Sequence, residues 1–471
     1  MHRLCRPQRW LALVSALLIS GCHARAGIEG RAPAALPWPA GIEVAFNHRV
    51  TARYRSPING QWRQGDDLEA LVLQSIERAQ RQILVAVQEL SLPRVAEALV
   101  RRRRQGLDVR VVLENTYSTS WSQQHDSDLN PHLRRRNQQL RQLGWGDAVL
   151  LLQQGGVPMI DDTADGSAGS GLMHHKFMVV DGATVITGSA NFTPSCVHGD
   201  PDDSGSRGNV NHLLRLHSPQ LAALFMAEFD RLWGDGPGGA PDSRFGVAKE
   251  NPGPQQALVG STSVQVLFAP HSQADPDHGL HWIDTLLSEA SEQVDLSLFV
   301  FSAQNLADAL RRLHEQGVRI RLLADPGFAN RSFSETLDLL GISLPDNDCR
   351  LEASNSPWQQ SLPGVGTPRL RAGDKLHHKF AVIDGRRVIT GSFNWSPSAA
   401  HQNDETLLVI DSPQLAAHFT REMNDLWRGA ELGITPRLQR KIERQQRLCG
   451  SGVERNESKT REPRPIEDGT N

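Results

Sequence analysis

Apolar residues recur with helix and strand periods in a stretch near the start of the chain. Residues 68–81 have helical spacing, 83–87 form a short β-branched run, 94–104 are helical again, and 109–113 form another strand. Gly106 stands where a helix C-cap is expected. Strands that alternate with helices predict an α/β fold around a mixed or parallel sheet.

The same pattern occurs a second time. The 84–114 segment, LVAVQELSLPRVAEALVRRRRQGLDVRVVLE, aligns without gaps with DLSLFVFSAQNLADALRRLHEQGVRIRLLAD at 295–325. The two copies also end alike, with SPQLAALFMAEFDRLW from Ser218 and SPQLAAHFTREMNDLW from Ser412. A repeat this long indicates two tandem domains rather than a solenoid.

Composition divides the rest of the chain. We expect domains at 43–234 and 261–433, joined by 235–260, a Gly- and Pro-rich segment that predicts a linker or a connection over the surface. Residues 23–42 are rich in Pro, Gly and Ala, which suits a tether. From 434 to 471 the pattern fades into a mildly basic tail, predicted to begin with a short helix and to be otherwise disordered.

The N-terminus has a basic start, a short apolar run at 10–19 and then Ser20-Gly21-Cys22. An apolar core this short is typical of a signal peptide rather than a membrane span. The small residues before Cys22 resemble a bacterial lipobox. That resemblance implies a lipoprotein-type signal at 1–22, lipidation of Cys22, and export to the periplasmic or surface side of the bacterial membrane. His23 favours the outer membrane by analogy. The alternative is an ordinary cleaved signal with an incidental cysteine.

Charge and cysteine usage exclude several classes. The net charge is −3, and removing residues 1–21 leaves 47 basic against 53 acidic residues. A globally basic nucleic-acid binder is therefore not indicated. Cys196, Cys349 and Cys449 show no C-x-x-C spacing, so we expect small buried residues rather than a disulfide framework or a zinc site. A single disulfide bridge stays open.

Each half contains one copy of a chemical motif, MHHKFMVVDGATVITGSAN from Met173 and LHHKFAVIDGRRVITGSFN from Leu376. Both follow the pattern H-x-K, four residues, D, six residues, G-S-x-N, at identical spacing. The first copy supplies His174, Lys176, Asp181, Gly188, Ser189 and Asn191, and the second supplies His377, Lys379, Asp384, Gly391, Ser392 and Asn394.

Strand alternation places His174 and Lys176 on one face and His175 on the other, until Asp181-Gly182 turns the chain. A second strand then brings Gly-Ser-x-Asn beside them, where Ser and Asn can donate to an oxyanion. Two such sets at one point fit a phosphodiester: the lysines oppose its negative oxygens, one imidazole attacks phosphorus, and the other protonates the leaving alkoxide. No metal or other cofactor is predicted.

This doubled motif resembles the phospholipase D superfamily, whose members place two such motifs in one active site. The resemblance implies two tandem α/β/α sandwich domains with mixed sheets, related by a pseudo-twofold axis, with the site at their interface. The catalytic set that it implies is His174, Lys176, Asp181, His377, Lys379, Asp384 and Glu405. Of these, we expect the two motif aspartates to form hydrogen bonds within their own domains. The resemblance implies phosphate binding by Ser189, Asn191, Ser392 and Asn394.

One difference between the two halves suggests separate roles for His174 and His377. Aligning Ser218 with Ser412 puts Asn211 where the second half has Glu405. In the superfamily the acid of this segment holds a motif histidine, so we place Glu405 beside His377, which becomes the general acid. Asn211 beside His174 then leaves a neutral nucleophile, in line with the superfamily assignment of the N-terminal histidine. An insertion offers alternative acids, namely Asp200, Asp202 and Asp203.

The same catalytic set serves lipid hydrolysis, phosphatidyl transfer and nucleic-acid cleavage in the superfamily. A lipid anchor and an acidic body favour a metal-independent, phospholipase D-type phosphodiesterase that cleaves the head-group side of a membrane phospholipid through a phosphohistidine. The alternatives are an exported nuclease, a cardiolipin-synthase-like phosphatidyl transferase, and a non-enzymatic phosphate- or lipid-binding module at the surface. No protein partner is implied, and a monomer suffices because both motifs are in one chain.

Overall fold

The structure, a computed structural model, describes residues 35–166, 171–200, 203, 205–450 and 452–455. The predicted signal peptide with Cys22, the tether as far as residue 34, and residues 456–471 lie outside the described residues. The predictions of lipidation and of a disordered final segment therefore stay predictions.

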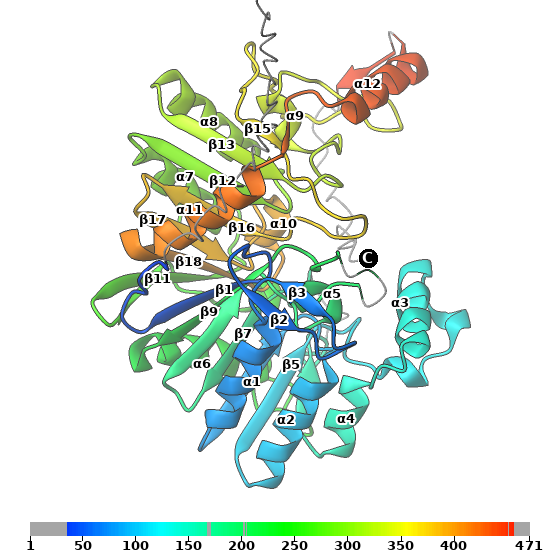
Figure 1. The fold of residues 1–471 in the computed structure, drawn as a ribbon, viewed down its shortest axis with the longest axis vertical. Coiled ribbons are helices and arrows are strands. Elements are labelled where there is room, and N and C mark those ends of the chain that lie inside the picture. Colours follow the sequence, from blue (N-terminus) through cyan, green and yellow to red (C-terminus); the bar gives the residue numbers. More distant parts are fainter. Residues whose placement is uncertain (1–34, 167–170, 201–202, 204, 451, 456–471) are drawn as a thin grey trace, which may run out of the picture. The chain divides into compact units, whose positions relative to one another are not determined.

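The first half of the chain forms a seven-stranded mixed sheet (Figure 1). Three of its strands, β4, β5 and β6, run parallel, and the others pair antiparallel. Its order is β1 (Ile42–Phe46), β9 (His212–His217), β8 (Thr184–Gly188), β7 (Lys176–Val180), β4 (Gln82–Val87), β5 (Asp108–Leu113) and β6 (Met159–Asp161).

The second half repeats this order and adds one strand at each edge. Its sheet runs β10 (Gln255–Val259), β11 (Thr262–Ala269), β18 (Glu405–Asp411), β17 (Arg387–Gly391), β16 (Lys379–Ile383), β12 (Gln293–Leu298), β13 (Arg319–Ala324), β15 (Val365–Thr367) and β19 (Glu431–Leu432). Two small ribbons pair β2 (Arg53–Arg55) with β3 (Trp62–Gln64) and β14 (Arg350–Leu351) with β20 (Glu454–Arg455). The two mixed sheets with helices confirm the predicted α/β class.

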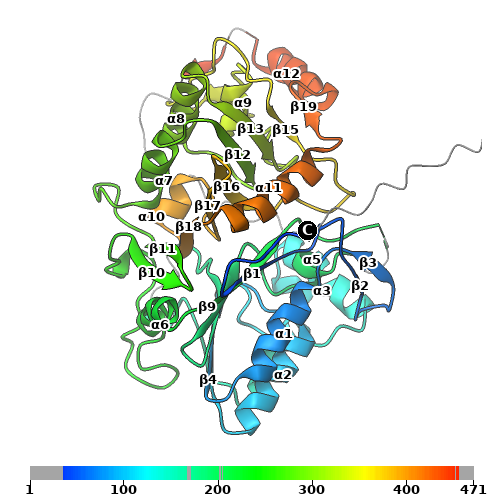
Figure 2. The same ribbon diagram turned by 60° about the vertical axis from the view of Figure 1, so that its left-hand side comes forward.

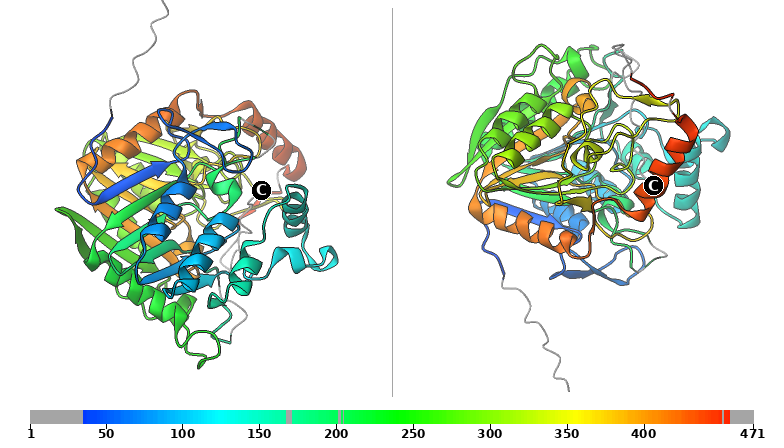
Figure 3. Two further views of the ribbon diagram at one scale, coloured as in Figure 1. Left: turned by 60° about the horizontal axis from the view of Figure 1, so that its bottom comes forward. Right: turned by 90° about the horizontal axis from the view of Figure 1, so that it is seen from above.

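Helices cover the outer face of each sheet (Figure 3). On the first sheet they are α1 (Leu68–Arg78), α2 (Pro93–Arg104) and α4 (Ala148–Gln154), and on the second they are α7 (Gly279–Ser288), α8 (Gln304–Glu315) and α9 (Glu335–Leu339). The remaining helices are α3 (Pro131–Gln142), α5 (Pro194–Val197), α6 (Pro219–Trp233), α10 (Pro397–His401), α11 (Pro413–Trp427) and α12 (Pro436–Cys449). The 3₁₀ turns are η1 (Trp121–Gln123), η2 (Asp126–Asp128) and η3 (Gly246–Ala248).

The helix ends follow the sequence signals. Asp67 caps α1 by accepting a hydrogen bond from the backbone N–H of Ala70. Gly106 and Gly317, at φ 92° and 88°, follow the ends of α2 and α8 in the left-handed conformation that glycine adopts without steric cost. The predicted C-cap position is therefore confirmed in both copies.

The two sheets share a buried core to which α6 and α11 both contribute side chains, and α11 lies near the middle of the molecule in Figure 2. One buried cluster contains Phe46 and Phe177 from the first half together with Phe268, Phe380 and Phe419 from the second. Helix α11 also contacts β1 of the first sheet, and α6 contacts β10 of the second. Each half therefore buries apolar surface of the other, and we expect them to fold as interdependent units.

The segment predicted as a linker does more than connect the halves. Its last part is strand β10, and the side chains of Phe245 and Lys249 are buried. The interpretation of 235–260 as a linker or surface connection is therefore wrong for these parts. Their burial depends on residues contributed by both sheets, which composition alone does not reveal.

The structure decides between the alternatives left open for the cysteines and shows how the tail begins. Cys349 and Cys449 form a disulfide across 100 residues of sequence, and Cys196 is a buried free thiol. Cys449 ends α12, so the start of the tail is a helix, as expected from the sequence, and the disulfide fixes it to the second half. Within the described part of the chain, no helix combines the length and apolarity that crossing a bilayer requires.

Candidate active site

The two motif copies meet where the halves cross. Lys176 and Lys379 are the first residues of β7 and β16, and the motif histidines precede them. The backbone N–H of His174 donates to the carbonyl of Asp404 at 3.0 Å, and that of His377 donates to the carbonyl of Val210 at 3.1 Å. These reciprocal contacts place each motif against the other half, as a pseudo-twofold arrangement requires.

The partners of the two histidines are exchanged relative to our prediction. His174 donates from Nδ1 to Oε1 of Glu405 at 2.7 Å, and His377 donates from Nδ1 to Oδ1 of Asn211 at 2.9 Å. The placement of Glu405 beside His377 and of Asn211 beside His174 is therefore wrong. The physical reason is the crossing: Val210, just before β9, pairs with Leu376, and Asp404, just before β18, pairs with Met173, so each segment lies beside the motif of the other half.

The source of an acid for His174 is thereby resolved. Glu405 is fully buried and belongs to the second half, so no acid from the first-half insertion is required. Asp203 instead accepts from the backbone N–H of Gly205. Asp202 lies outside the described residues.

The motif serines hold the partners of the histidines. Ser392 donates to Oε2 of Glu405 at 2.6 Å, and Ser189 donates to Oδ1 of Asn211 at 2.8 Å. Both hydroxyls also accept a backbone N–H, and both side chains are fully buried. The prediction that Ser189 and Ser392 bind phosphate is therefore wrong, and they are positioning residues.

The hydrogen-bond network determines the form of His377. Asn211 donates from Nδ2 to the carbonyls of Cys196 and Asn209, at 3.2 and 3.0 Å, so its Oδ1 faces the imidazole as an acceptor. Nδ1 of His377 must then carry a proton. Its Nε2 lies 3.0 Å from Nζ of Lys379, from which it accepts. In the same way the carboxylate of Glu405 directs the reactive lone pair of His174 to Nε2.

The two lysines have different neighbours. Lys176 donates to the carbonyl of His174 at 2.8 Å and to Oε1 of Gln88 at 3.3 Å. Lys379 donates to the carbonyl of His377 at 3.0 Å, and its ammonium lies 4.9 Å from the ring centre of Phe299. Gln88 and Phe299 occupy aligned positions in the two halves, so one lysine has an amide where the other has an aromatic face.

The motif asparagines remain candidates for phosphate binding. Asn191 donates from Nδ2 to Oε1 of Gln88 at 3.1 Å. Within the described residues, the buried Oδ1 atoms of Asn191 and Asn394 have no donor. An amide can turn its nitrogen towards an anionic ligand by rotating about its last bond, so both side chains can serve a phosphate oxygen.

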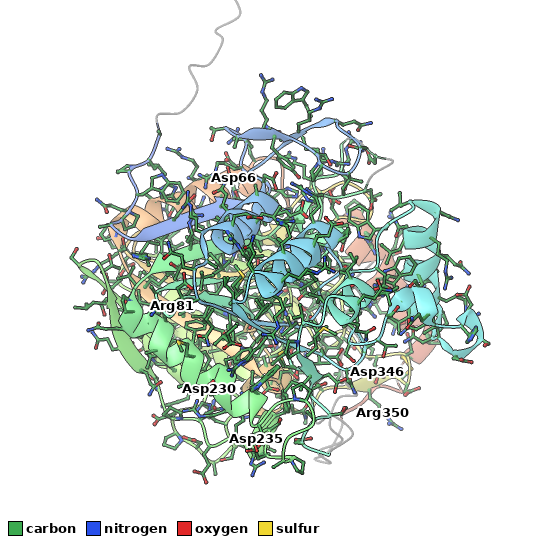
Figure 4. The ribbon with its side chains drawn as sticks, turned by 90° about the horizontal axis from the view of Figure 1, so that it is seen from below. Asp66, Arg81, Asp230, Asp235, Asp346 and Arg350 are labelled. Carbon is green, nitrogen blue, oxygen red and sulfur yellow. A yellow bond between two sulfur atoms is a disulfide. The ribbon has the colours of Figure 1, made fainter. Side chains whose placement is uncertain are left out.

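The motif aspartates lie away from this chemistry. Asp181, at φ 54°, follows β7 and accepts from the backbone N–H groups of Gln80, Arg81 and Gln82 at 2.7–2.9 Å. Arg81, labelled in Figure 4, directly precedes β4, the strand that pairs with β7. Burial raises the pKa of the Asp181 carboxyl, but the three backbone donors outweigh it and lower the pKa.

Asp384 repeats this arrangement, with φ 50° and bonds to the backbone N–H groups of 291–293. Both aspartates thus tie the end of a motif strand to the start of its neighbour. The expectation that they bond within their own domains agrees with these contacts, and including Asp181 and Asp384 among the catalytic residues is wrong.

Behind the first motif lies a buried ion network that the sequence analysis missed. His175 contacts Glu228 of α6 at 3.0 Å, Glu228 pairs with Lys249, and Lys249 pairs with Asp404 at 2.7 Å. Burial favours the neutral form of Glu228, yet the charge of Lys249 and the hydrogen bond from His175 lower its pKa to about 2. The network fixes the residue next to Glu405.

The second half has no matching lysine in its described part. His378 contacts Glu422 of α11 at 3.3 Å and His212 at 3.0 Å, and His212 contacts the hydroxyl of Thr390 at 2.6 Å. Burial raises the pKa of Glu422 to about 8 and lowers that of His212 to about 3. The hydrogen-bonded series of Glu422, His378 and His212 is therefore neutral at pH 7.

Comparison with known proteins gives the family. The model described as "Cardiolipin synthase, PLD-like domain" matches residues 72–233 and 283–427, which together are more than half of the chain. The chain belongs to the phospholipase D superfamily. Both matched segments contain one complete motif, and the predicted resemblance is confirmed.

The individual relatives align with a smaller part of the chain than the family model does. The chain is 32% identical over 144 residues to human mitochondrial cardiolipin hydrolase, covering 30% of this chain and 48% of that protein. It is 26% identical over 133 residues to phospholipase D of Rickettsia typhi, covering 28% of this chain and 55% of that protein. The chain spans about half the length of the curated relatives it matches.

One solved structure extends over both halves of the chain. The crystal structure of phosphatidylserine synthase from Haemophilus influenzae Rd KW20 aligns with a TM-score of 0.55 and 14% identity. The alignment covers 88% of this chain and 95% of that chain. At this identity the likeness supports the two-sheet fold.

Several positions in the site had a weak sequence signal. Glu228 and Glu422 fall on one another in the repeated SPQ segments, and so do Gln88 and Phe299 in the earlier repeat. Only alignment of the two halves marks these positions. Lys249 has no counterpart in either repeat, so no pattern in the chain points to it.

Proposed function

We propose that this protein is a metal-independent phosphodiesterase of the phospholipase D type, which cleaves the head-group-side phosphodiester of membrane phospholipids through a phosphohistidine at His174. The observation that carries the proposal is the crossed pair of His174 and Glu405. A buried imidazole held by a carboxylate through Nδ1 presents a nucleophilic Nε2 and gains a counter-ion for the charge it acquires.

In the first step Nε2 of His174 attacks phosphorus, and the bond from phosphorus to the head-group oxygen breaks. As the P–N bond forms, positive charge develops on the imidazole, and Glu405 at 2.7 Å stabilises it. His377 donates a proton from Nε2 to the leaving alkoxide. An anionic phosphate beside His377 raises its pKa, so the imidazole takes up this proton when substrate binds.

In the second step His377 removes a proton from water, and the water oxygen attacks the phosphorus. The P–N bond breaks, the phosphate monoester leaves, and His174 returns to its neutral form. Lys176 and Lys379 supply positive charge for the non-bridging oxygens, with Asn191 and Asn394 as neutral donors. Both steps therefore use groups that the two halves already hold at their crossing.

A lipid substrate and an exported location support each other. The relatives named above include a cardiolipin hydrolase and a phospholipase D. The disulfide between Cys349 and Cys449 suits an oxidising compartment, as the signal-like N-terminus does. We propose anchoring through Cys22 on the outer membrane and action as a monomer.

The test uses a chain without the anchor, residues 23–471, which retains the whole compact unit from Leu36 onward. It is incubated in EDTA with phosphatidylcholine, phosphatidylglycerol or single-stranded DNA. Head-group release with a labelled His174 after acid-free quenching supports the proposal. Label on His377 would mean that the two histidines have the opposite roles. Oligonucleotide products alone would show that the protein is a nuclease. If the folded protein forms no product from any substrate, it is a non-enzymatic binding module.

A further inference from the structure

A cavity of about 720 Å³ lies between α12 and the loop that follows β13. Its charge is strongly one-sided, with Glu443 the single acid among the lining residues. The cations of this basic groove are Arg331 from the loop and Arg437, Arg440, Lys441, Arg444 and Arg447 from α12.

Carboxylates of the described residues form few contacts with these cations. In the described residues none of the six forms an ion pair with a carboxylate, whereas Arg101 and Arg102 on α2 both pair with Glu77. Burial and then the charges of Arg331 and its α12 neighbours lower the pKa of Lys441. The groove therefore presents a concentrated positive field on a body with a net negative charge.

Helix α12 is fixed firmly to the second half. Leu438 is buried in the outer core of that half, and Gln445 donates to the carbonyls of Pro345 and Asp346 at 3.0 and 2.9 Å. The disulfide at Cys449 fixes its last residue. Figure 4 labels Asp346, whose carbonyl accepts from Gln445, and Arg350, the first residue of β14, whose backbone N–H donates to the Asp346 carboxylate. These anchors leave the basic side chains outermost.

Exposed aliphatic side chains lie on the same helix and in the segments at its two ends. Leu432, Ile434, Leu448 and Val453 are 44%, 50%, 59% and 38% exposed, and they are half of the large apolar residues exposed in the described part of the chain. Basic side chains beside exposed aliphatic ones are the composition of surfaces that bind at a membrane interface.

We propose that the basic groove and its flanking aliphatic residues dock the protein on an anionic phospholipid surface. The guanidinium groups bind lipid phosphates, and the aliphatic side chains enter the interfacial layer. A soluble polyanion such as single-stranded DNA matches the cations but gives the aliphatic residues no role. Docking itself requires no catalysis, and its link to lipid turnover rests on the proposed function.

The groove also connects to the site. The guanidinium of Arg331 lies 5.8 Å from the ring of Phe328, which lies 4.7 Å from that of Phe299, which in turn lies 4.6 Å from the imidazole of His377. Three successive side-chain contacts through buried aromatic rings therefore link the groove to His377.

The test measures sedimentation of the chain 23–471 with vesicles of equal phosphatidylglycerol and phosphatidylcholine, and with vesicles of phosphatidylcholine alone. The variant Arg437→Gln/Arg440→Gln/Arg444→Gln removes three groove charges. The control Arg101→Gln/Arg103→Gln/Arg104→Gln removes three charges from α2. Each basic residue near an anionic surface contributes roughly fivefold, so we expect about 100-fold weaker binding for the groove variant and little change for the control. Equal binding by both variants overturns the proposal.

A second variant separates membranes from nucleic acid. We expect Ile434→Ser/Leu448→Ser to weaken vesicle binding while any binding of a single-stranded oligonucleotide stays unchanged. If wild type prefers the oligonucleotide and these serines leave vesicle binding intact, the groove is a nucleic-acid site instead and the proposal fails.

The proposed function is tested apart from docking with a short-chain phospholipid below its critical micelle concentration. The groove variant should cleave this soluble substrate like wild type, since the groove is not catalytic. Absence of cleavage by wild type with vesicle binding retained removes the enzyme proposal and still supports docking.

Discussion

Glu228 on α6 and Glu422 on α11 occupy the same place in the two halves, yet they carry different charges at neutral pH. Each contacts the second histidine of its motif, His175 or His378. The pKa of Glu228 is lowered to about 2, whereas burial raises that of Glu422 to about 8. Lys249 makes the difference for Glu228, which shows that one residue outside a repeat can reverse the electrostatics of a repeated position.

The catalytic positions differ in the same way. His174 has a carboxylate partner, Glu405, while His377 has the neutral amide of Asn211. A carboxylate stabilises the charge of a phosphorylated imidazole, and an amide leaves an imidazolium acidic enough to release its proton. We therefore keep His174 as the nucleophile, for a reason opposite to the one inferred from the sequence.

The largest effect should come from the histidines. We expect His174→Ala and His377→Ala each to lower the cleavage rate of a natural lipid by about 10⁴-fold. With a nitrophenyl phosphodiester, whose leaving group needs no protonation, His377→Ala should regain most of the first-step rate and His174→Ala should not. Burst-phase kinetics of nitrophenol release measure this, and rescue of His174→Ala instead would exchange the two roles.

Next in size is the stability difference between the two glutamates. Glu228→Gln leaves Lys249 short of a buried counter-ion and should cost about 3–5 kcal/mol of unfolding free energy at pH 7. Glu422→Gln should be nearly neutral at pH 6, because the carboxyl it replaces is protonated there. Urea unfolding of both variants measures the difference, and equal losses would contradict the charge assignment.

The pH dependence follows from the direction of each shift. Folded Glu422 keeps its proton up to about pH 8 whereas an unfolded glutamate loses it near 4.5, so wild-type stability falls as pH rises through this window. The slope is at most about 1.4 kcal/mol per pH unit, and Glu422→Gln should lack it. Glu228 stabilises the folded state fully above pH 4.5, and this stabilisation is lost only as the pH falls towards 2.

The histidine partners should have smaller effects on catalysis. Glu405→Gln keeps the geometry but removes the charge, and we expect a loss of about 100-fold in kcat with a small change in KM. Asn211→Asp raises the pKa of His377 and should move the alkaline limb of the kcat profile to higher pH. Ser392→Ala, which removes the hydrogen bond to Glu405 and one to the backbone of Thr406 but keeps the charge of Glu405, is the control. An unchanged profile for Asn211→Asp would argue against His377 as the acid.

The smallest effect concerns the lysine neighbours. Gln88→Leu removes an acceptor of Lys176, and Phe299→Leu removes the aromatic face near Lys379. We expect losses of about tenfold in kcat/KM for each, with the folded state retained. Steady-state kinetics with a single lipid substrate compare them. A much larger loss at Phe299 than at Gln88 would indicate that the aromatic wall also binds substrate.

Much of the fold and of the motif was predictable because the signals are local or repeated. Strand and helix periods mark β4, α2 and β5, and the glycine after α2 marks its end within a few residues. Identical spacing in two copies marks both histidines and both lysines without any knowledge of their surroundings.

The partners of those residues depended on the tertiary structure. Glu405 and His174 are 231 residues apart and meet only because the two halves cross, whereas Cys349 and Cys449, 100 residues apart, are brought together by packing within the second half. Lys249 gains its role from two carboxylates on different halves. The sequence alone thus determined which chemical groups are present and how they repeat. The packing of the halves decided which groups pair, because a buried contact depends on backbones brought together from distant parts of the chain, and no local period encodes it.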